Sequence, residues 1–237
     1  MKECGRDLIS RLGGVSLQAC KIYGNQLLRA LHYVHSIGAI HADVKPDNIL
    51  IGENEAIVRL CDFGTALFDY QVSSITAEYG SLYYRAPEII LGYDVSTQVD
   101  VWGLACCLIE LFTGEILFKG NSNNNMLELF MQLVGKFPKK LIKKSSFGAS
   151  HFDLDRMKYN KKTWDSITGK LIVSQKPIST QPQRNLFRDI LSPVAQNTAE
   201  SRSSLLQFAD VLMQMLHYDP QKRLTPAQAL QHPFFAS

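Results

Sequence analysis

The chain has 237 residues, of which 46% are hydrophobic and 20% charged, and its formal net charge at pH 7 is +3. This length and balance predict one globular domain with a large core, and the charge is too mild to imply nucleic-acid binding, so no direct nucleic-acid partner is predicted. The five cysteines form no CxxC pair or zinc-binding spacing, and no apolar run reaches the roughly 18 residues of a membrane span, so we expect an intracellular protein with reduced cysteines and no membrane contact.

The first clear element is a helix that begins after Ser16, a typical N-cap residue. Apolar side chains recur behind it at steps of three and four residues, at Cys20, Tyr23, Leu27, Leu31 and Val34, and Gly38 is the expected stop. His32 and His35 lie one turn apart on this helix, which is a spacing that could suit a metal ion. Since no other ligand is in view, we favour partly exposed histidines near the helix end.

The stretch 41–48, HADVKPDN, places a carboxylate, a lysine and a carboxamide at fixed offsets ahead of the apolar run 49–51. Phosphoryl transfer needs such a set, because its charge sits on phosphate oxygens and metal ions and a carboxylate must accept the proton of the incoming hydroxyl. We predict that Asp43 accepts this proton, that Lys45 reaches a phosphate oxygen and that Asn48 holds a metal ion.

A second carboxylate follows the next β-rich run. Residues 49–51 and 57–60 are short and rich in branched side chains, and the turn-prone sequence Gly-Glu-Asn-Glu lies between them. We therefore predict a β-hairpin that carries the two polar loops at its ends. In the sequence Cys-Asp-Phe-Gly that follows, Asp62 can bind the metal beside Asn48, and Gly64 can let the chain bend sharply.

Residues 65–84 show no helical or strand period and carry many hydroxyl groups, at Ser73, Ser74, Thr76, Tyr79, Ser81, Tyr83 and Tyr84. Ser96 is the expected N-cap of the next helix. Residues 99–112 are apolar on nearly every face of that helix, which predicts a buried helix.

Residues 121 to about 200 are the least regular part of the chain. Helical periodicity appears over 126–134, and residues 136–162 then contain nine basic side chains against two acidic ones. A solvated face is the favoured interpretation of this run, and a docking patch for acidic or phosphorylated partners is the alternative. Residues 174–197 are polar and contain proline, which predicts a long loop, and residues 205–216 are apolar at helical spacing.

Three tripeptides, His41-Ala42-Asp43, Asp62-Phe63-Gly64 and Ala86-Pro87-Glu88, occur in an order and at separations that resemble a protein kinase. The resemblance implies a mainly helical α+β fold, namely the large C-terminal lobe over residues 1–237. It assigns 41–48 to the catalytic loop and 62–88 to the activation segment. It also implies that Asp100 fixes the backbone of the catalytic loop, and that a buried Arg223 pairs with Glu88.

The insert at about 121–200 and the sequence Tyr-Arg-Ala-Pro-Glu at 84–88 resemble the CMGC group of kinases. HADVKPDNIL, with Ala42 where most kinases have Arg, and NNNMLELFMQLVGKFPKKLIKK resemble the pre-mRNA-processing Prp-four serine/threonine kinases. The resemblance implies ATP and Mg²⁺ as cofactors, with Leu50 below the adenine, and Ser or Thr of proteins as the acceptor, since Lys45 follows Asp43 by two residues. Spliceosomal substrates and a nuclear location are expected.

No glycine-rich loop, strand lysine or paired helix glutamate is found in the sequence, so we expect the small N-terminal lobe to be absent from this chain. Two interpretations stay open. A fragment of an active kinase is favoured because Asp43, Lys45, Asn48 and Asp62 are all intact, and a catalytically inactive large-lobe binding module, as in a pseudokinase scaffold, is the alternative. If Tyr79 is phosphorylated, Arg85 is the nearest cation that matches the family.

Overall fold

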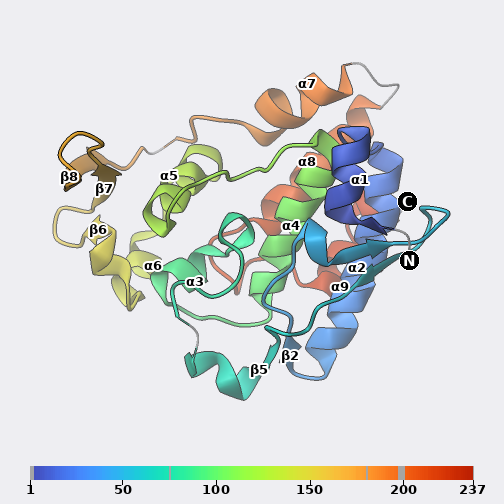
Figure 1. Cartoon of the computed structure of the whole chain (residues 1–237), viewed down its shortest axis with the longest axis horizontal. Helices are drawn as coiled ribbons and strands as arrows, with labels where there is room; N and C mark the ends of the chain where they lie inside the picture. Colours follow the sequence, from blue (N-terminus) through green and yellow to red (C-terminus); the bar gives the residue numbers. More distant parts are fainter. Residues whose placement is uncertain (1–2, 75, 180, 197–200, 237) are drawn as a thin grey trace.

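Figure 1 shows a computed structural model of the chain, which describes residues 3–74, 76–179, 181–196 and 201–236. Helices α1, α2 and α8 pack against the central helix α4, and the β7–β8 hairpin projects from the far end of the molecule (Figure 1). The helix-rich fold with small sheets that the sequence predicts is confirmed. None of the described helices is long and apolar enough to cross a membrane.

Helix α2 (Leu17–Ser36) begins as predicted, since the Ser16 hydroxyl accepts a hydrogen bond from the Ala19 N–H at 3.1 Å. Its buried stripe contains Cys20, Leu27, Leu28 and Leu31, and Gly38 follows its end with a left-handed φ of +73°. Of the two histidines, His32 is exposed, whereas His35 is partly buried and its Nε2 lies 2.9 Å from Asp100 Oδ2.

Helix α4 (Gln98–Thr113) is the buried central helix of the fold. Every residue from 99 to 112 is buried, as the sequence predicts for a helix that is apolar all round. Its N-cap is Thr97 and not Ser96, which is a shift of one residue within the usual fraying of helix ends. Helix α1 (Gly5–Leu12) lies against α4. After α1, the N–H of Val15 donates a hydrogen bond to Leu111 O of α4 at 2.7 Å.

Strands β3 (Ile49–Ile51) and β4 (Val58–Leu60) pair antiparallel with Ile49 opposite Leu60, so the predicted hairpin is confirmed. Strand β1 (Glu3–Cys4) adds a third strand along β3. A strand of two residues has no period that a sequence could reveal. A second small sheet joins β2 (Ala39–Ile40) to β5 (Leu67–Phe68).

The region after α4 contains the helix that the periodicity over 126–134 predicts, and it also contains regular structure at 174–197, where we expected a loop. Helices α5 (Asn123–Leu133) and α6 (Lys139–Lys144) precede a three-stranded antiparallel sheet of β6 (Phe152–Asp153), β7 (Lys158–Trp164) and β8 (Leu171–Pro177). The long-loop prediction for 174–197 is wrong, because residues 174–177 complete β8, and a π-helix η5 (Leu186–Leu191) and helix α7 (Ser192–Ala195) follow. Pairing with β7 carries the strand from the apolar residues 171–173 into the polar residues 174–177. Asn197 lies outside the described residues.

Helices α8 (Arg202–Met215), α9 (Pro226–Leu230) and α10 (Pro233–Ala236) close the fold. The remaining short elements are η1 (Pro46–Asn48), η2 (Asp69–Ser74), η3 (Leu82–Tyr84), α3 (Pro87–Leu91) and η4 (Gly148–Ser150). The predicted ion pair between Arg223 and Glu88 is confirmed, since the two side chains are fully buried and share hydrogen bonds of 2.6 and 2.9 Å. This bidentate pair fixes the segment after α8 against α3.

Candidate active site

The loop 41–48 is held by a buried carboxylate of α4. Asp100 accepts hydrogen bonds from His41 N at 2.9 Å and from Ala42 N at 2.8 Å, and its Oδ2 lies 2.9 Å from His35 Nε2. Ala42 has a φ of +66°, a left-handed backbone conformation that costs a non-glycine residue of order 1–3 kcal/mol. The charge-assisted hydrogen bonds to Asp100 offset this cost. The same hydrogen bonds confirm the predicted contact between Asp100 and the loop backbone.

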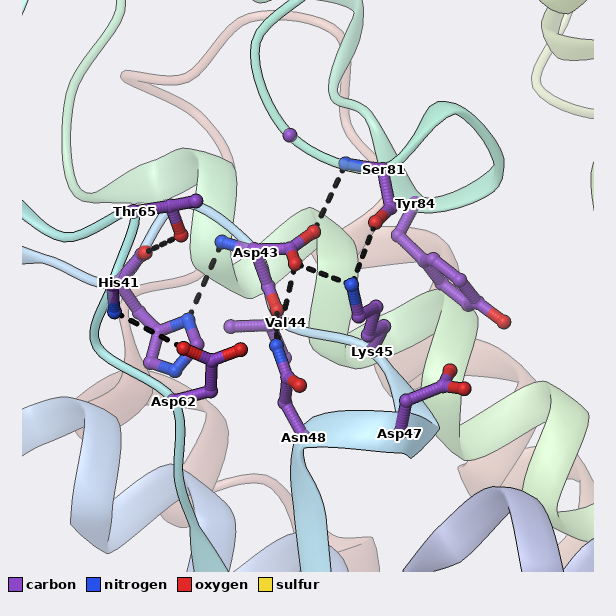
Figure 2. Close-up of polar contacts among 12 residues, drawn as sticks. His41, Asp43, Val44, Lys45, Asp47, Asn48, Asp62, Thr65, Ser81 and Tyr84 are labelled. Carbon is purple, nitrogen blue, oxygen red and sulfur yellow. Dashed lines mark hydrogen bonds and ion pairs between the residues drawn. The ribbon is translucent and has the colours of Figure 1, made fainter.

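Two of the predicted site residues, Lys45 and Asn48, contact a third, Asp43 (Figure 2). Lys45 Nζ donates to Asp43 Oδ2 at 2.6 Å, and the Asn48 amide donates to Asp43 O at 2.9 Å and to Oδ2 at 3.3 Å. Ser81 completes the cluster, because its N–H donates to Asp43 Oδ1 at 2.9 Å and its hydroxyl accepts from Lys45 at 3.0 Å. In the sequence, Ser81 is one of several hydroxyl residues with no assigned role, and its contact with Asp43 is visible only in the structure.

The carboxyl group of Asp43 is held in its ionised form. Burial acts to raise its pKa, but the hydrogen bonds from Lys45 and Ser81 outweigh burial and leave the pKa below its ordinary value. At neutral pH the group is therefore a carboxylate, which can accept a proton.

Asp62 is brought to the same loop through its two neighbours. Cys61 N donates to Asn48 O at 2.9 Å, and the rings of Phe63 and His41 are in T-shaped contact, with their centroids 4.8 Å apart. The sharp bend lies at Asp62 itself, whose φ is +61°, and not at Gly64, which does not have a positive φ. Asp62 Oδ1 accepts from Gly64 N at 3.2 Å, a local hydrogen bond typical of aspartate in this conformation.

Asn48 and Asp62 have the donor atoms that Mg²⁺ prefers. The amide N–H of Asn48 is used on Asp43, so the atom that this side chain can offer to a cation is its carbonyl oxygen. Asp62 is exposed and offers a carboxylate. Two oxygen ligands suit Mg²⁺, which keeps several waters and shares phosphate oxygens with its substrate. Leu50 is half-buried on β3, and its contact with adenine stays a prediction.

A second polar cluster beside the site was missed in the sequence. Glu110 of α4 is buried, accepts from the Tyr84 hydroxyl at 2.6 Å and is ion-paired with Arg6 of α1, which also lies 3.3 Å from Asp47. Burial raises the pKa of Glu110, against the opposing effect of Tyr84 and Arg6. A lone glutamate within an otherwise apolar helix is the signal that could have found it, since a buried charge needs partners.

Arg85, the cation that we expected to lie nearest to a phosphorylated Tyr79, is engaged with the backbone beside that residue. Its buried guanidinium donates to the main-chain oxygens of Tyr79, Glu78 and Gly80 at 2.6–2.9 Å, and to Asn123 Oδ1 at 2.7 Å. The Tyr79 hydroxyl donates to Thr65 O at 2.6 Å. Arg85 therefore holds the backbone of 77–80 in place, and its pairing with a phosphate group on Tyr79 stays a prediction.

A loop anchored by the buried Asp100, the Asp43 carboxylate paired with Lys45 and the exposed carboxylate of Asp62 thus lie in one region of the fold. Residues 2–235 match the family model of the protein kinase domain, and the chain belongs to the protein kinase family.

Among its relatives, the chain is 37% identical over 99% of its length to the serine/threonine-protein kinase prpf4B of Dictyostelium discoideum, and 38% identical over 97% to the serine/threonine-protein kinase prp4 of Schizosaccharomyces pombe. It is 32% identical over 96% of its length to the human dual specificity tyrosine-phosphorylation-regulated kinase 3. The matched part spans 28%, 48% and 38% of these three proteins, respectively.

Proposed function

We propose that this chain carries the catalytic part of a serine/threonine protein kinase, which transfers the γ-phosphoryl group of magnesium-ATP to hydroxyl groups of protein substrates. In this proposal the described residues form the large lobe of the kinase, with 41–48 as catalytic loop, 62–88 as activation segment and about 121–200 as a CMGC-type insert. The observation that carries it is the carboxylate of Asp43, which Lys45, Asn48 and Ser81 hold ionised and in a fixed orientation.

Each residue then has a chemical role. Asp43 orients the substrate hydroxyl and accepts its proton as the oxygen attacks the γ-phosphorus and the bond to the β-phosphate oxygen breaks. Lys45, already beside Asp43, contacts the transferred phosphoryl group and offsets its charge. Asn48 and Asp62 hold Mg²⁺, which when bound neutralises the phosphate oxygens. Leu50 packs below the adenine ring.

The substrate class and the location rest on similarity. Lys45 stands two residues after Asp43, as in kinases that act on Ser and Thr, and the relatives with the highest identities quoted above are serine/threonine kinases named prpf4B and prp4. We infer that the substrates include spliceosomal proteins and that the protein acts in the nucleus. The alternative of an inactive binding module gains no support, because no part of the polar set around Asp43 is lost or misplaced within the described residues.

The test compares two carboxylate variants of the full-length protein. Asp43→Asn should lower phosphoryl transfer to a Ser/Thr peptide by about 10²–10⁴-fold while nucleotide affinity stays nearly unchanged, because Asp43 acts on the substrate hydroxyl. Asp62→Asn should weaken magnesium-nucleotide binding as well as transfer. The exposed Asp155→Asn variant is the matched control and should behave as the wild type. Equal losses of nucleotide affinity in Asp43→Asn and Asp62→Asn would reject these assignments.

A further inference from the structure

Two neighbouring cavities form a groove that leads away from the candidate active site. One, of about 560 Å³, is bordered by Leu82 and Arg85, which follow Ser81 in the chain. The other, of about 540 Å³, is bordered by Trp164 and Leu171 at the end of the β7–β8 hairpin. Both cavities share Asn121, Ser122, Asn124 and Lys162 in their walls, so the groove continues from the segment beside Asp43 to the hairpin.

The wall of this groove is fixed by the start of α5. Asn123 accepts from Arg85 at 2.7 Å and donates to Ala77 O at 2.8 Å, which ties α5 to the segment 77–85. The buried Asn124 accepts from Lys162 N at 2.8 Å and donates to Asn160 O at 3.0 Å, which ties α5 to β7. The groove is thus preformed, and binding in it requires no ordering of the backbone.

Lys162 contributes a positive charge to the groove, whose walls also contain the carboxylates of Glu78 and Glu128. The neighbouring Lys161 is neutralised by Glu128 at 2.7 Å, and Lys144 of the same basic run is ion-paired with Asp94. Within the described ranges, by contrast, no carboxylate lies within ion-pair distance of Lys162. The charge of Lys162 also reaches the buried His151, because it adds to the effect of burial in lowering the pKa of that histidine. Of the lysines at 136–162, Lys162 is thus the cation that faces both cavities.

The far end of the groove is apolar. Trp164 is 72% exposed and Leu171 is 46% exposed, although both are large hydrophobic side chains. An exposed tryptophan beside a cation without an ion-pair partner is typical of a surface that binds another protein. Aromatic side chains contribute much of the binding energy at such surfaces, and charged groups determine which partner is bound.

This inference rests on the proposed function. We propose that the groove binds the segment of the protein substrate that extends away from the phosphorylated residue on one side. Lys162 then selects a glutamate or aspartate side chain in that segment. Trp164 and Leu171 then cover the apolar part of the same segment. Continuity with Ser81 and Asp43 identifies the occupant as substrate, and the charge of Lys162 sets its chemistry. In this proposal only Lys162 of the basic run 136–162 takes part in docking, and the other lysines of the run are solvated or paired.

The test measures peptide binding without any need for turnover. The probes are three labelled serine peptides of equal length, one with glutamates before the serine, one with glutamates after it and one with glutamines at all of these positions. Anisotropy of the label gives the affinity of the full-length protein for each peptide. We expect tighter binding, by about two- to five-fold, for glutamates on one flank only, which is the range of a surface ion pair.

Three variants locate this preference. Lys162→Ala should abolish it, and Lys162→Glu should reverse it, so that the glutamine peptide binds more tightly. Lys176→Ala is the matched control, since Lys176 is exposed on the same hairpin and borders neither cavity, and it should keep the preference. Equal affinities for all three peptides, or the same behaviour of Lys162→Ala and Lys176→Ala, would overturn the proposal.

Phosphorylation of the same peptides separates this inference from the proposed function. A charge preference that depends on Lys162 without any phosphoryl transfer would leave the groove as an acidic-peptide site and reject the kinase proposal. Transfer to all three peptides with equal affinity and rate would keep the kinase proposal and reject the role of Lys162.

Discussion

Helix α4 and the β7–β8 hairpin differ in the burial of their side chains. Along α4, even the charged residues Asp100 and Glu110 are buried, and each is bonded to groups from distant segments. On the hairpin, Trp164, Ile167 and Ile172 are exposed although they are apolar. The first region gains stability from buried contacts, whereas the second offers a surface that contributes little to it. Substitutions should therefore separate the two regions.

The largest effect on stability should come from the buried pair that supports the α4 region. Arg223→Ala leaves the carboxylate of Glu88 buried without its partner, which should lower the free energy of unfolding by about 3–5 kcal/mol. Urea titration followed by circular dichroism measures this loss. Arg156→Ala, an exposed arginine in the insert, is the control, and a loss no larger than that of the control would show that the pair is not a main support.

One buried histidine of the insert should make stability depend on pH. Burial and the charge of Lys162 lower the pKa of His151 from 6.5 to about 4, so between these pH values the unfolded state binds more protons than the folded state. Stability should fall as the pH drops from 6.5 to 4, by up to about 3 kcal/mol, and this fall should end below pH 4.

His151→Gln should remove this part of the pH dependence, while the exposed His32→Gln should keep it. Unfolding free energies at a series of pH values measure the difference. Parallel profiles for the wild type and His151→Gln would contradict the assignment.

A smaller loss should follow from the contact between α4 and the loop 41–48. A Cβ on Gly103 would lie 3.0 Å from Val44 O and 3.2 Å from Val44 Cβ, so Gly103→Ala should cost about 1–3 kcal/mol by overpacking. Because Val44 follows Asp43 directly, the substitution should also reduce phosphoryl transfer. Ala105→Gly, a change of similar size on the same helix, removes an atom and introduces no such clash. Unaltered stability and activity of Gly103→Ala would show that the loop can move away freely.

The smallest effect is expected on the hairpin. Trp164→Ala and Ile167→Ser remove exposed apolar side chains and should change the free energy of unfolding by less than about 0.5 kcal/mol. The same Trp164→Ala should weaken binding of the acidic peptide. Thermal denaturation checks the first expectation, and a loss of several degrees would mean that the hairpin supports the fold in the way that α4 does.

The sequence by itself determined the features that depend on residues close together in the chain. The stretch HADVKPDN, the hairpin of β3 and β4, the N-cap of α2 and the burial of α4 all follow from spacing and periodicity within about 20 residues. The pairing of Arg223 with Glu88 and the contact of Asp100 with the loop were also predicted, although only through resemblance to protein kinases.

The tertiary structure alone decided the contacts between distant segments. Arg6 and Glu110 are 104 positions apart, and Ser81 meets Asp43 across 38 positions, so no local pattern reports either contact. The bonding of Arg85 to carbonyl oxygens and the strand β8 likewise depend on neighbours that only the fold supplies. The physical reason is that a hydrogen bond or ion pair is set by distance in space, whereas periodicity reports only which face of one element is buried.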